Sequence, residues 1–283
     1  KLARRHIEEN IFKVLMIGSF WLVAGSLGLI LLTVIVKGLP GLTLEMLTQS
    51  PKGGFYLGKE GGILNAIVGS LYLAGGATIL ALIISLPIVL YLTVYARKER
   101  WLFMVRLALD VLWGIPSIVY GAFGFIVMLA LGIRASLLGG IIVLTILELP
   151  IMARAMDEII RIMPREMNEA TLALGATRLE VALTVIVRQA LPGILTAMLL
   201  AFGRGIGDAA SVLFTAGYTD RMPDGLLRPV ASLPLAVFFQ LGTPYPEVQQ
   251  RGYTSALVLT VIVLIISLTA RWLSQRLSRN VVR

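Results

Sequence analysis

Long apolar runs separated by short charged segments set the pattern of this chain. The runs approach the roughly 20 residues that a helix needs to cross the hydrocarbon core of a bilayer, which is about 30 Å thick. The pattern therefore predicts an all-α, polytopic membrane protein with a single transmembrane domain over residues 1–283. The six predicted transmembrane helices cover about residues 14–36, 66–95, 111–131, 136–153, 193–217 and 255–270.

One polar stretch, residues 163–188, interrupts this pattern between the fourth and fifth predicted spans. Pro164 can open a helix without losing a useful N–H group, and Gly175 can supply the left-handed residue that ends it. The apolar positions that share one face of this helix are Met167, Ala170 and Leu174. The stretch therefore predicts a short amphipathic helix outside the membrane.

A second helix is predicted directly after the first. Thr177 and Glu180 form a T-x-x-E capping box, which starts a helix in a new direction two residues after Gly175. The result is a rigid elbow whose exposed first helix fits the helix-in-groove mode of recognition by another protein. The alternative is an ordinary amphipathic helix that lies on the membrane surface.

Composition excludes several classes of protein. Hydrophobic residues make up 57% of the chain and charged residues 14%, with a mean hydropathy of +0.87, which leaves too little polar surface for a soluble globule. The absence of cysteine rules out disulfides, thiolate zinc sites and iron–sulfur clusters. The single histidine, His6, lies in a charged N-terminal tail and is expected to be solvated.

Lysine and arginine gather in four segments: the N-terminal tail, the connection between the second and third spans, the polar elbow and the C-terminal tail. By the positive-inside rule these segments are cytoplasmic, which suits an even number of spans. The net charge of +9 is thus explained by topology. Nucleic-acid binding is not expected, because no basic patch interleaved with aromatic residues is present.

The fifth predicted span contains two charged residues, Arg204 and Asp208, one helical turn apart. Charges at this depth are costly, so they should face the bundle interior or a watery cavity. A guanidinium offers fixed, forked donors that suit a tetrahedral oxyanion. The alternative is a structural ion pair between helices. Glycines 203, 205 and 207 would allow close helix contact or leave room for a substrate.

Other charges lie near predicted span ends. Glu148 and Asp110 could act as ion relays, although pairing with a neighbouring arginine is favoured, and Arg106 stands at i, i+4 from Asp110. Two external connections, residues 37–62 and 218–253, are too long for simple turns. The second contains an apolar run, residues 233–241, that is too short to cross and is expected at the interface or the outer mouth.

Enzyme chemistry finds little support in the sequence. Residues 53–60 match the first part of a phosphate-binding G-x-x-x-x-G-K loop, but Glu60 replaces the serine or threonine that would hold magnesium. We find no histidine–cysteine cluster or catalytic serine motif. The chain is therefore predicted to be a transport subunit without a cofactor of its own, driven by a separate ATPase.

The elbow resembles the EAA loop of ABC-importer permeases, the coupling helix that docks into a nucleotide-binding subunit. Glu169-Ala170-Thr171 is followed by Gly175 at the family spacing. Thr171 replaces the second alanine, and residues 187–188 are Val-Arg where the family usually has Leu-Pro. The residues to which the resemblance assigns ATPase coupling are Glu169, Ala170, Thr171, Leu174 and Gly175.

A narrower resemblance extends over nearly the whole chain. The segments at residues 61–71, 115–121 and 149–154, together with Arg204-x-Ile206-Gly207-Asp208, are similar to the permease subunits of phosphate importers. The resemblance implies that Arg204, and with less support Arg154, contact phosphate. Asp208 stands where that family usually has glutamate, one methylene longer, and is taken as part of the substrate site.

These observations predict half of the translocation pathway of an ATP-driven phosphate importer in the cytoplasmic membrane of a bacterium or archaeon. The partners implied by the resemblance are a homologous second permease, two copies of an ATP-binding subunit that carry ATP and magnesium, and an external phosphate-binding protein. One alternative is a permease for sulfate, molybdate or phosphonate. Another is an ion-coupled secondary transporter with Asp208 and Glu148 as proton or sodium sites.

Overall fold

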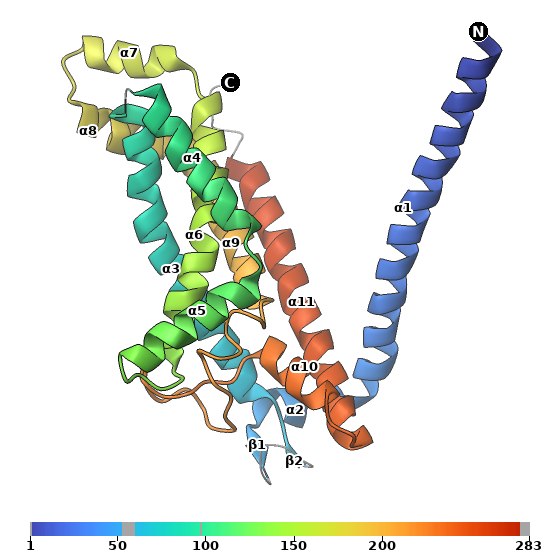
Figure 1. Cartoon of the computed structure of the whole chain (residues 1–283). Coiled ribbons are helices and arrows are strands. Elements are labelled where there is room, and N and C mark those ends of the chain that lie inside the picture. The colour runs from blue at the N-terminus through green and yellow to red at the C-terminus, as the bar shows by residue number, and fades with distance from the viewer. Residues whose placement is uncertain (1, 53–59, 97, 278–283) are drawn as a thin grey trace.

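The computed structural model describes residues 2–52, 60–96 and 98–277 (Figure 1). Most of these residues are helical; the exceptions include a two-stranded antiparallel ribbon of β1 (Pro51–Lys52) and β2 (Glu60–Gly61) and the non-helical segment 207–232. The long helices are α1 (Leu2–Gly38), α3 (Leu64–Val94), α4 (Glu99–Gly114), α5 (Ser117–Ala130), α6 (Leu137–Ile162), α9 (Val187–Ile206) and α11 (Pro246–Leu277). The shorter helical segments are η1 (Leu39–Gly41), α2 (Leu44–Thr48), α7 (Arg165–Ala173), α8 (Arg178–Glu180), the π-helical turn η2 (Val181–Ile186) and α10 (Leu233–Leu241).

The described residues supply the six predicted spans if one bent pair is counted as a single span. Five helices are long and apolar enough to cross a membrane: α1, α3, α6, the continuous helix Arg178–Ile206 and α11. The sixth span consists of α4 and α5, which meet at an angle of 96°. The predicted all-α membrane architecture is thus confirmed, with two corrections to the course of the spans.

The first correction concerns the predicted span 111–131, which is not a continuous helix. α4 ends at Gly114, Ile115 is extended, and α5 begins after Pro116. Proline disfavours helical geometry in the residue that precedes it, so the chain turns at Ile115 instead of continuing. The break places α5 across the axis of α4, as Figure 1 shows.

The second correction concerns the fifth span, predicted at residues 193–217. Its helix ends at Ile206, and the chain continues through Asp208 in turns that are not helical. At its other end the helix extends back without a break to Arg178, so the second helix of the elbow and the fifth span are one helix of 29 residues. The second helix of the elbow and Arg204 therefore belong to the same continuous helix.

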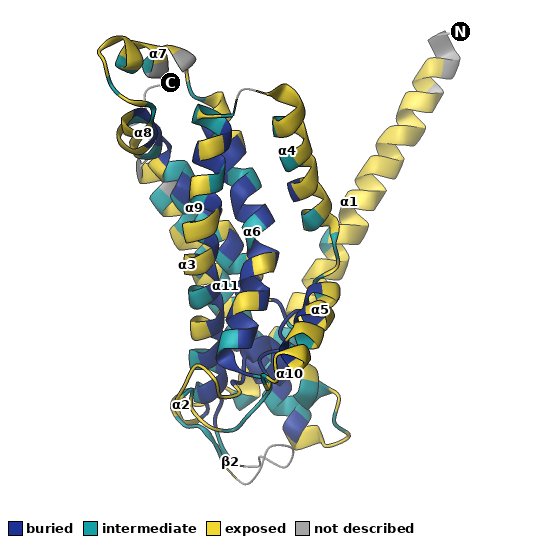
Figure 2. Ribbon diagram, turned by 60° about the vertical axis from the view of Figure 1, so that its left-hand side comes forward, coloured by how far each residue is buried: buried dark blue, intermediate teal, exposed yellow. Residues whose placement is uncertain are grey.

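α6 occupies the centre of the bundle and packs against α3, α9, α4 and α5 (Figures 1 and 2). Small side chains let these helices approach closely: Ala77 and Ala81 on α3, Ala153 on α6 and Ala201 on α9 are fully buried. α1 behaves differently. It contacts α11 and η1 near its C-terminal end, while the rest of it stands away from the bundle with its apolar side chains exposed.

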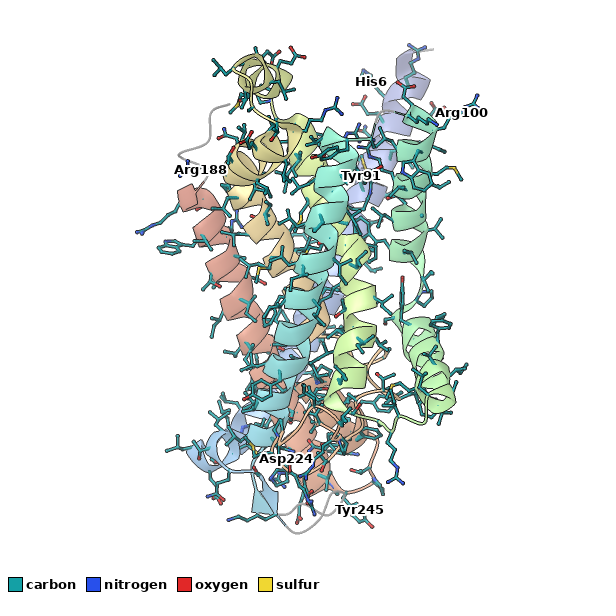
Figure 3. All side chains as sticks on the ribbon, turned by 90° about the vertical axis from the view of Figure 1, so that its left-hand side faces the viewer. His6, Tyr91, Arg100, Arg188, Asp224 and Tyr245 are labelled. Carbon is teal, nitrogen blue, oxygen red and sulfur yellow. The ribbon has the colours of Figure 1, made fainter. Side chains whose placement is uncertain are left out.

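The molecule has two distinct ends. The N-terminal part of α1, the elbow formed by α7 and α8, and the last turns of α11 lie at one end, while α2, β1, β2 and α10 lie at the other (Figure 1). Figure 3 places His6, Arg100 and Arg188 at the elbow end, with Asp224 and Tyr245 at the opposite end. α10, which covers the apolar run 233–241, is a short helix with its first turn buried.

Candidate functional site

Arg204 lies in the last turn of α9, where its positive charge also complements the carboxyl end of the helix dipole. Its Nη1 donates to Oδ1 of Asp208 at 3.1 Å, so the predicted i, i+4 pair is formed. The backbone N–H of Ser211 donates to Oδ2 of Asp208 at 2.8 Å. Asp208 is buried, and its two oxygens join Arg204 to the turn that follows the helix.

The guanidinium of Arg204 is only partly covered. Its side chain is 49% exposed, and it borders a groove of about 590 Å³ between α9 and α11. The residues that line the groove are Thr196, Leu199, Leu200, Gly203 and Arg204 from α9 and Val263, Ser267, Ala270, Arg271 and Gln275 from α11. Asp208 thus orients one edge of the guanidinium and leaves its remaining surface toward an open, mostly apolar space in which a charge-assisted contact is strong.

The glycines around Arg204 have different surroundings. Gly203 has open space where a side chain would begin, which agrees with its place on the groove. A Cβ at Gly205 would lie 1.9 Å from Oε1 of Glu148, so this position is restricted to glycine by close approach of α6. Glycine at residue 205 therefore allows close helix contact, whereas glycine at residue 203 leaves free space on the groove.

Glu148 is fully buried between α3, α6 and α9. The hydroxyl of Thr78 donates to its Oε2 at 2.8 Å, whereas Oε1 has no hydrogen-bond partner among the described residues. The expected pairing with an arginine is therefore wrong. The reason is geometric: Glu148 faces the glycine side of α9, while Arg204 faces the groove.

Four charged residues join α4 to α6. Arg106 donates from Nε and Nη2 to the two carboxylate oxygens of Asp157, at 2.8 and 3.0 Å. Nε of Arg154 lies 2.6 Å from Oδ1 of Asp110, and its Nη1 lies 3.7 Å from Oδ2 of Asp157. The expected pairing of Asp110 with an arginine is confirmed, but its partner is Arg154 on α6 and not Arg106 on its own helix, which pairs with Asp157. Arg154, the second predicted phosphate contact, is held in this network.

We predict that Asp157→Asn destabilises the protein markedly. Asp157 is fully buried, and the amide would leave Arg106 with an uncompensated charge, which costs roughly 3 kcal/mol in buried pairs. Thermal unfolding of the purified complex should show a clear fall in melting temperature. Asp110→Asn is the matched control, with a smaller effect because Asp110 is 46% exposed. Equal melting temperatures for the two variants would contradict this role.

The elbow has the predicted local structure. α7 ends at Ala173 with Leu174 as its C-cap, and Gly175 follows with a φ of +88°, the left-handed conformation that favours glycine. The capping box is complete: the hydroxyl of Thr177 accepts from the backbone N–H of Glu180, whose carboxylate accepts from the backbone N–H of Thr177 at 2.7 Å. Thr171 fits without distortion, since its hydroxyl donates to the carbonyl of Met167. The second helix continues through residues 187–188.

The exposed surface of α7 has few contacts with the bundle. Glu169 and Ala170 are exposed, and Leu174 is 89% exposed at the end of the helix. Leu172, on the same helix, is also exposed. An exposed leucine pair on a short charged helix outside the apolar spans is a surface that a groove on another protein can cover.

The capping box should respond to acid. The backbone N–H and the hydroxyl of Thr177 both donate to the ionised carboxylate, which lowers the pKa of Glu180 below its usual value. The cap therefore contributes stability above the usual glutamate pKa of about 4.3 and loses it as the pH falls through the lowered value. Amide-exchange protection of residues 178–186 should decrease in that range. In the Glu180→Gln variant this protection should not change over the same pH range. A wild-type protein whose protection does not decrease would contradict the role of the Glu180 carboxylate in the cap.

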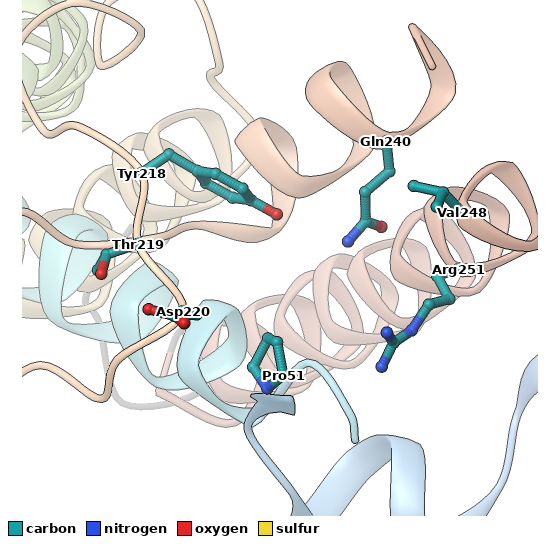
Figure 4. A pocket seen from close by; sticks show the side chains of 7 residues that line it. All are labelled: Pro51, Tyr218, Thr219, Asp220, Gln240, Val248 and Arg251. Carbon is teal, nitrogen blue, oxygen red and sulfur yellow. The ribbon is translucent and has the colours of Figure 1, made fainter. Parts of the chain in front are cut away.

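A polar hollow lies at the opposite end, where the two long connections meet (Figure 4). It is lined by Pro51, Tyr218, Thr219, Asp220, Gln240, Val248 and Arg251. Its volume of about 20 Å³ holds about one water molecule, which is too little for a tetrahedral anion. Arg251 donates to the carbonyl of Gly61 and so ties α11 to the first connection. We assign the hollow a structural role.

Two parts of the site were missed by the sequence reasoning. The contact of Glu148 with Gly205 depends on how α6 and α9 cross, for which the sequence holds no direct signal. The α11 side of the groove does have a signal, because Ser267, Arg271 and Gln275 recur every fourth residue and share a helix face. The glycine-rich segment that resembles a phosphate-binding loop lies almost wholly outside the described residues.

Comparisons with known proteins place this geometry in context. Residues 91–283 match the family described as "Binding-protein-dependent transport system inner membrane component". The phosphate transport system permease protein PstA of Xylella fastidiosa strain 9a5c is 36% identical over 249 residues, covering 86% of this chain and 84% of that protein. PstA of Haemophilus influenzae is 31% identical over 256 residues, covering 90% and 88%.

Solved structures show the same fold at lower identity. A chain of the inward-facing MetNI methionine ABC transporter superposes with a TM-score of 0.62 at 19% identity, covering 76% of this chain and 95% of that one. A chain of an amino acid ABC transporter gives a TM-score of 0.57 at 18% identity, with coverage of 76% and 93%. These chains therefore share the overall fold of this protein over about three quarters of its length.

Proposed function

The chain belongs to the family of binding-protein-dependent transport system inner membrane components, and from this premise we propose that it forms half of the membrane pathway of an ATP-driven importer of inorganic phosphate. The phosphate assignment is supported by relatives named PstA that are 31–36% identical over most of the chain. The protein is a multi-pass membrane subunit of a transporter. ATP and magnesium belong to a separate ATP-binding subunit in this proposal.

The observation that carries the proposal is Arg204. It is a permanently charged side chain in the last turn of an apolar helix, held on one side by Asp208 and half exposed to the groove. Asp208 is buried, whereas about half of the Arg204 side chain stays accessible beside the groove. The exposed donors of Arg204 suit an oxyanion that passes along the groove. Asp208 fixes the guanidinium and is expected to act through it.

Coupling to ATP hydrolysis is proposed to pass along one helix. The elbow and Arg204 are joined by the continuous helix Arg178–Ile206, which is roughly 40 Å long at 1.5 Å per residue. A movement of α7 by a docked ATPase therefore displaces the helix that carries Arg204 as a rigid body. The movement caused by closure of the ATPase would thus be passed to Arg204 along one helix and not through a series of loops.

Orientation and partners follow from the two ends of the molecule. The elbow end carries Arg100 and Arg188 and is proposed to be cytoplasmic, in the inner membrane of a bacterium or archaeon. Two copies of an ATP-binding subunit would dock there, one of them on α7. An external phosphate-binding protein would dock at the end with α2 and α10. A second, homologous permease would complete the pathway across the groove.

We predict that Leu174→Asp separates the ATP-binding subunit from the complex. Leu174 is 89% exposed and packs on little of this chain, so its replacement should leave the fold intact and disrupt the docking surface. Co-purification of the ATP-binding subunit should fall sharply, and Glu169→Lys on the same helix should act in the same direction. Leu227→Asp, a substitution at an exposed leucine of the opposite end, is the control. Full retention of the ATPase in Leu174→Asp would contradict the docking role of α7.

The substrate class can be tested through ATPase stimulation. In the reconstituted complex, the external binding protein loaded with phosphate should stimulate ATP hydrolysis, and the same protein exposed to sulfate, molybdate or a phosphonate should not. Stimulation by another oxyanion in place of phosphate would move the assignment to that substrate. Uptake that persists without ATP and collapses with an ion gradient would favour an ion-coupled secondary transporter.

A further inference from the structure

The groove beside Arg204 has a polar stripe on its α11 side. Val263, Ser267, Arg271 and Gln275 follow one another at intervals of four residues, so they lie on one face of the helix, and all four line the groove. The side chains between them that face away are apolar and exposed: Leu264, Ile265 and Leu268. The hydroxyl of Thr269, off the stripe, donates to the carbonyl of Ile266. Polar groups on this part of α11 are thus concentrated along the groove.

From this arrangement we propose that the groove between α9 and α11 is an anion path, with Arg271 as a second oxyanion-binding residue between Arg204 and the elbow end. The proposal rests on the proposed function and deepens it. It commits to one occupant, the transported inorganic phosphate. The opposite wall of the path would come from the second permease, because an anion cannot remain against lipid.

The spacing along the groove suits stepwise passage. α9 and α11 run in opposite directions, so the residues after Ser267 lead toward the elbow end (Figure 1). Arg271 and Gln275 lie roughly 6 and 12 Å beyond Ser267 along the helix axis. Conduction of an ion requires several sites that each bind weakly enough to release it. Two guanidiniums with a hydroxyl between them provide such a series for phosphate.

The positive-inside rule explains why a positive charge lies near the end of α11. It does not explain why Arg271 lines the groove. Arg276, five residues further on, satisfies the positive-inside rule equally well. Its guanidinium instead stacks over the ring of Trp272 at 4.2 Å and is not part of the groove lining. The C-terminal part of α11 therefore offers one arginine that lines the groove and one engaged elsewhere. Arg276 is a matched control for Arg271.

Uptake by the full complex in liposomes tests the role of Arg271. Arg271→Gln should lower the initial rate of phosphate uptake by roughly tenfold, the scale of one lost charge-assisted hydrogen bond. Arg271→Lys should retain most of the rate, and Arg276→Gln should match wild type. Equal rates for Arg271→Gln and Arg276→Gln would overturn the proposal. So would a defect in Arg271→Gln that disappears when phosphatidylglycerol is left out of the liposomes, since the ligand would then be a lipid headgroup.

The absence of cysteine in the chain permits a second, independent measurement. A water-soluble thiol reagent should label Ser267→Cys during ATP turnover, phosphate should slow the labelling, and Leu268→Cys should stay unlabelled on the lipid side. Equal labelling of the two variants would overturn the path. If the wild-type complex transports sulfate instead of phosphate, the proposed function fails. The anion path is then tested by the same comparisons, Arg271→Gln with Arg276→Gln and Ser267→Cys with Leu268→Cys, with sulfate as the substrate.

Discussion

An Arg204→Gln variant should take up phosphate about 30-fold more slowly than wild type, the scale of one lost hydrogen bond to a charged group, roughly 2 kcal/mol. The glutamine would remove the positive charge beside the groove and leave Asp208 without its ion-pair partner. That carboxylate would then repel a passing anion. Because Arg204 is half exposed, the variant complex should still assemble, which size-exclusion chromatography can verify. Initial rates of labelled phosphate uptake give the magnitude.

A double variant separates the two causes of that loss. Arg204→Gln with Asp208→Asn removes the orphaned carboxylate together with the arginine. If Arg204 contacts phosphate, the double variant stays inactive, because the donor is still missing. If Arg204 acts only as the counter-ion of Asp208, uptake returns toward the wild-type rate. Recovery in the double variant would contradict the proposed contact with the anion.

Substituting valine for Gly205 should prevent formation of a stable complex. A Cβ at this position would lie 1.9 Å from Oε1 and 3.0 Å from Cδ of Glu148, a side chain that is fully buried and so has little room to move aside. Overpacking of a core costs up to about 3 kcal/mol, and a displaced Glu148 would also lose its hydrogen bond from Thr78. The yield and melting temperature of the purified complex measure the effect.

Gly203→Ala is the control for this substitution, because no atom lies within 4 Å of the position that its Cβ would take. It should leave the melting temperature unchanged. A second-site change provides a stricter test: Glu148→Ala should partly rescue Gly205→Ala by making room for the methyl group. A stable Gly205→Val complex, or no rescue in the double variant, would show that α6 and α9 do not cross at this contact.

Local features of the chain could be predicted from its sequence. The capping box of Thr177 and Glu180, the left-handed Gly175 and the pair of Arg204 with Asp208 each depend on residues within four positions of one another. Within a helix, the 3.6-residue repeat brings residues three or four positions apart close together. Their spacing in the sequence is therefore enough to identify which residues interact. The elbow was predictable for this reason.

The course of the third and fifth spans could not be predicted from hydropathy. The apolar run across Gly114 and Pro116 hides a sharp break, since hydropathy does not register backbone geometry. The turns after Ile206 are apolar and largely buried, and buried coil has the same composition as buried helix. Pro116 is the signal for this break in the sequence, because proline disfavours helical geometry in the residue before it.

The partners in the ion pairs could not be predicted for a different reason. Arg106 and Asp110 have the spacing of a pair within one helix, yet each pairs with α6 instead. Because Asp157 and Arg154 offer buried partners across the interface, the tertiary contacts prevail over the local ones. Such a choice depends on how two helices are placed. The neighbours of Glu148 could not be predicted for the same reason, since they are set by the crossing of α3, α6 and α9.

The central claim is that this subunit carries phosphate across a membrane at the expense of ATP. Its most direct test is uptake of labelled phosphate into liposomes that contain the full complex, with ATP inside and the phosphate-loaded binding protein outside. We predict accumulation against a phosphate gradient that requires ATP, persists when ion gradients are collapsed by ionophores, and is lost in Arg204→Gln. Accumulation that needs an ion gradient and no ATP, or that is unchanged in Arg204→Gln, would contradict the account.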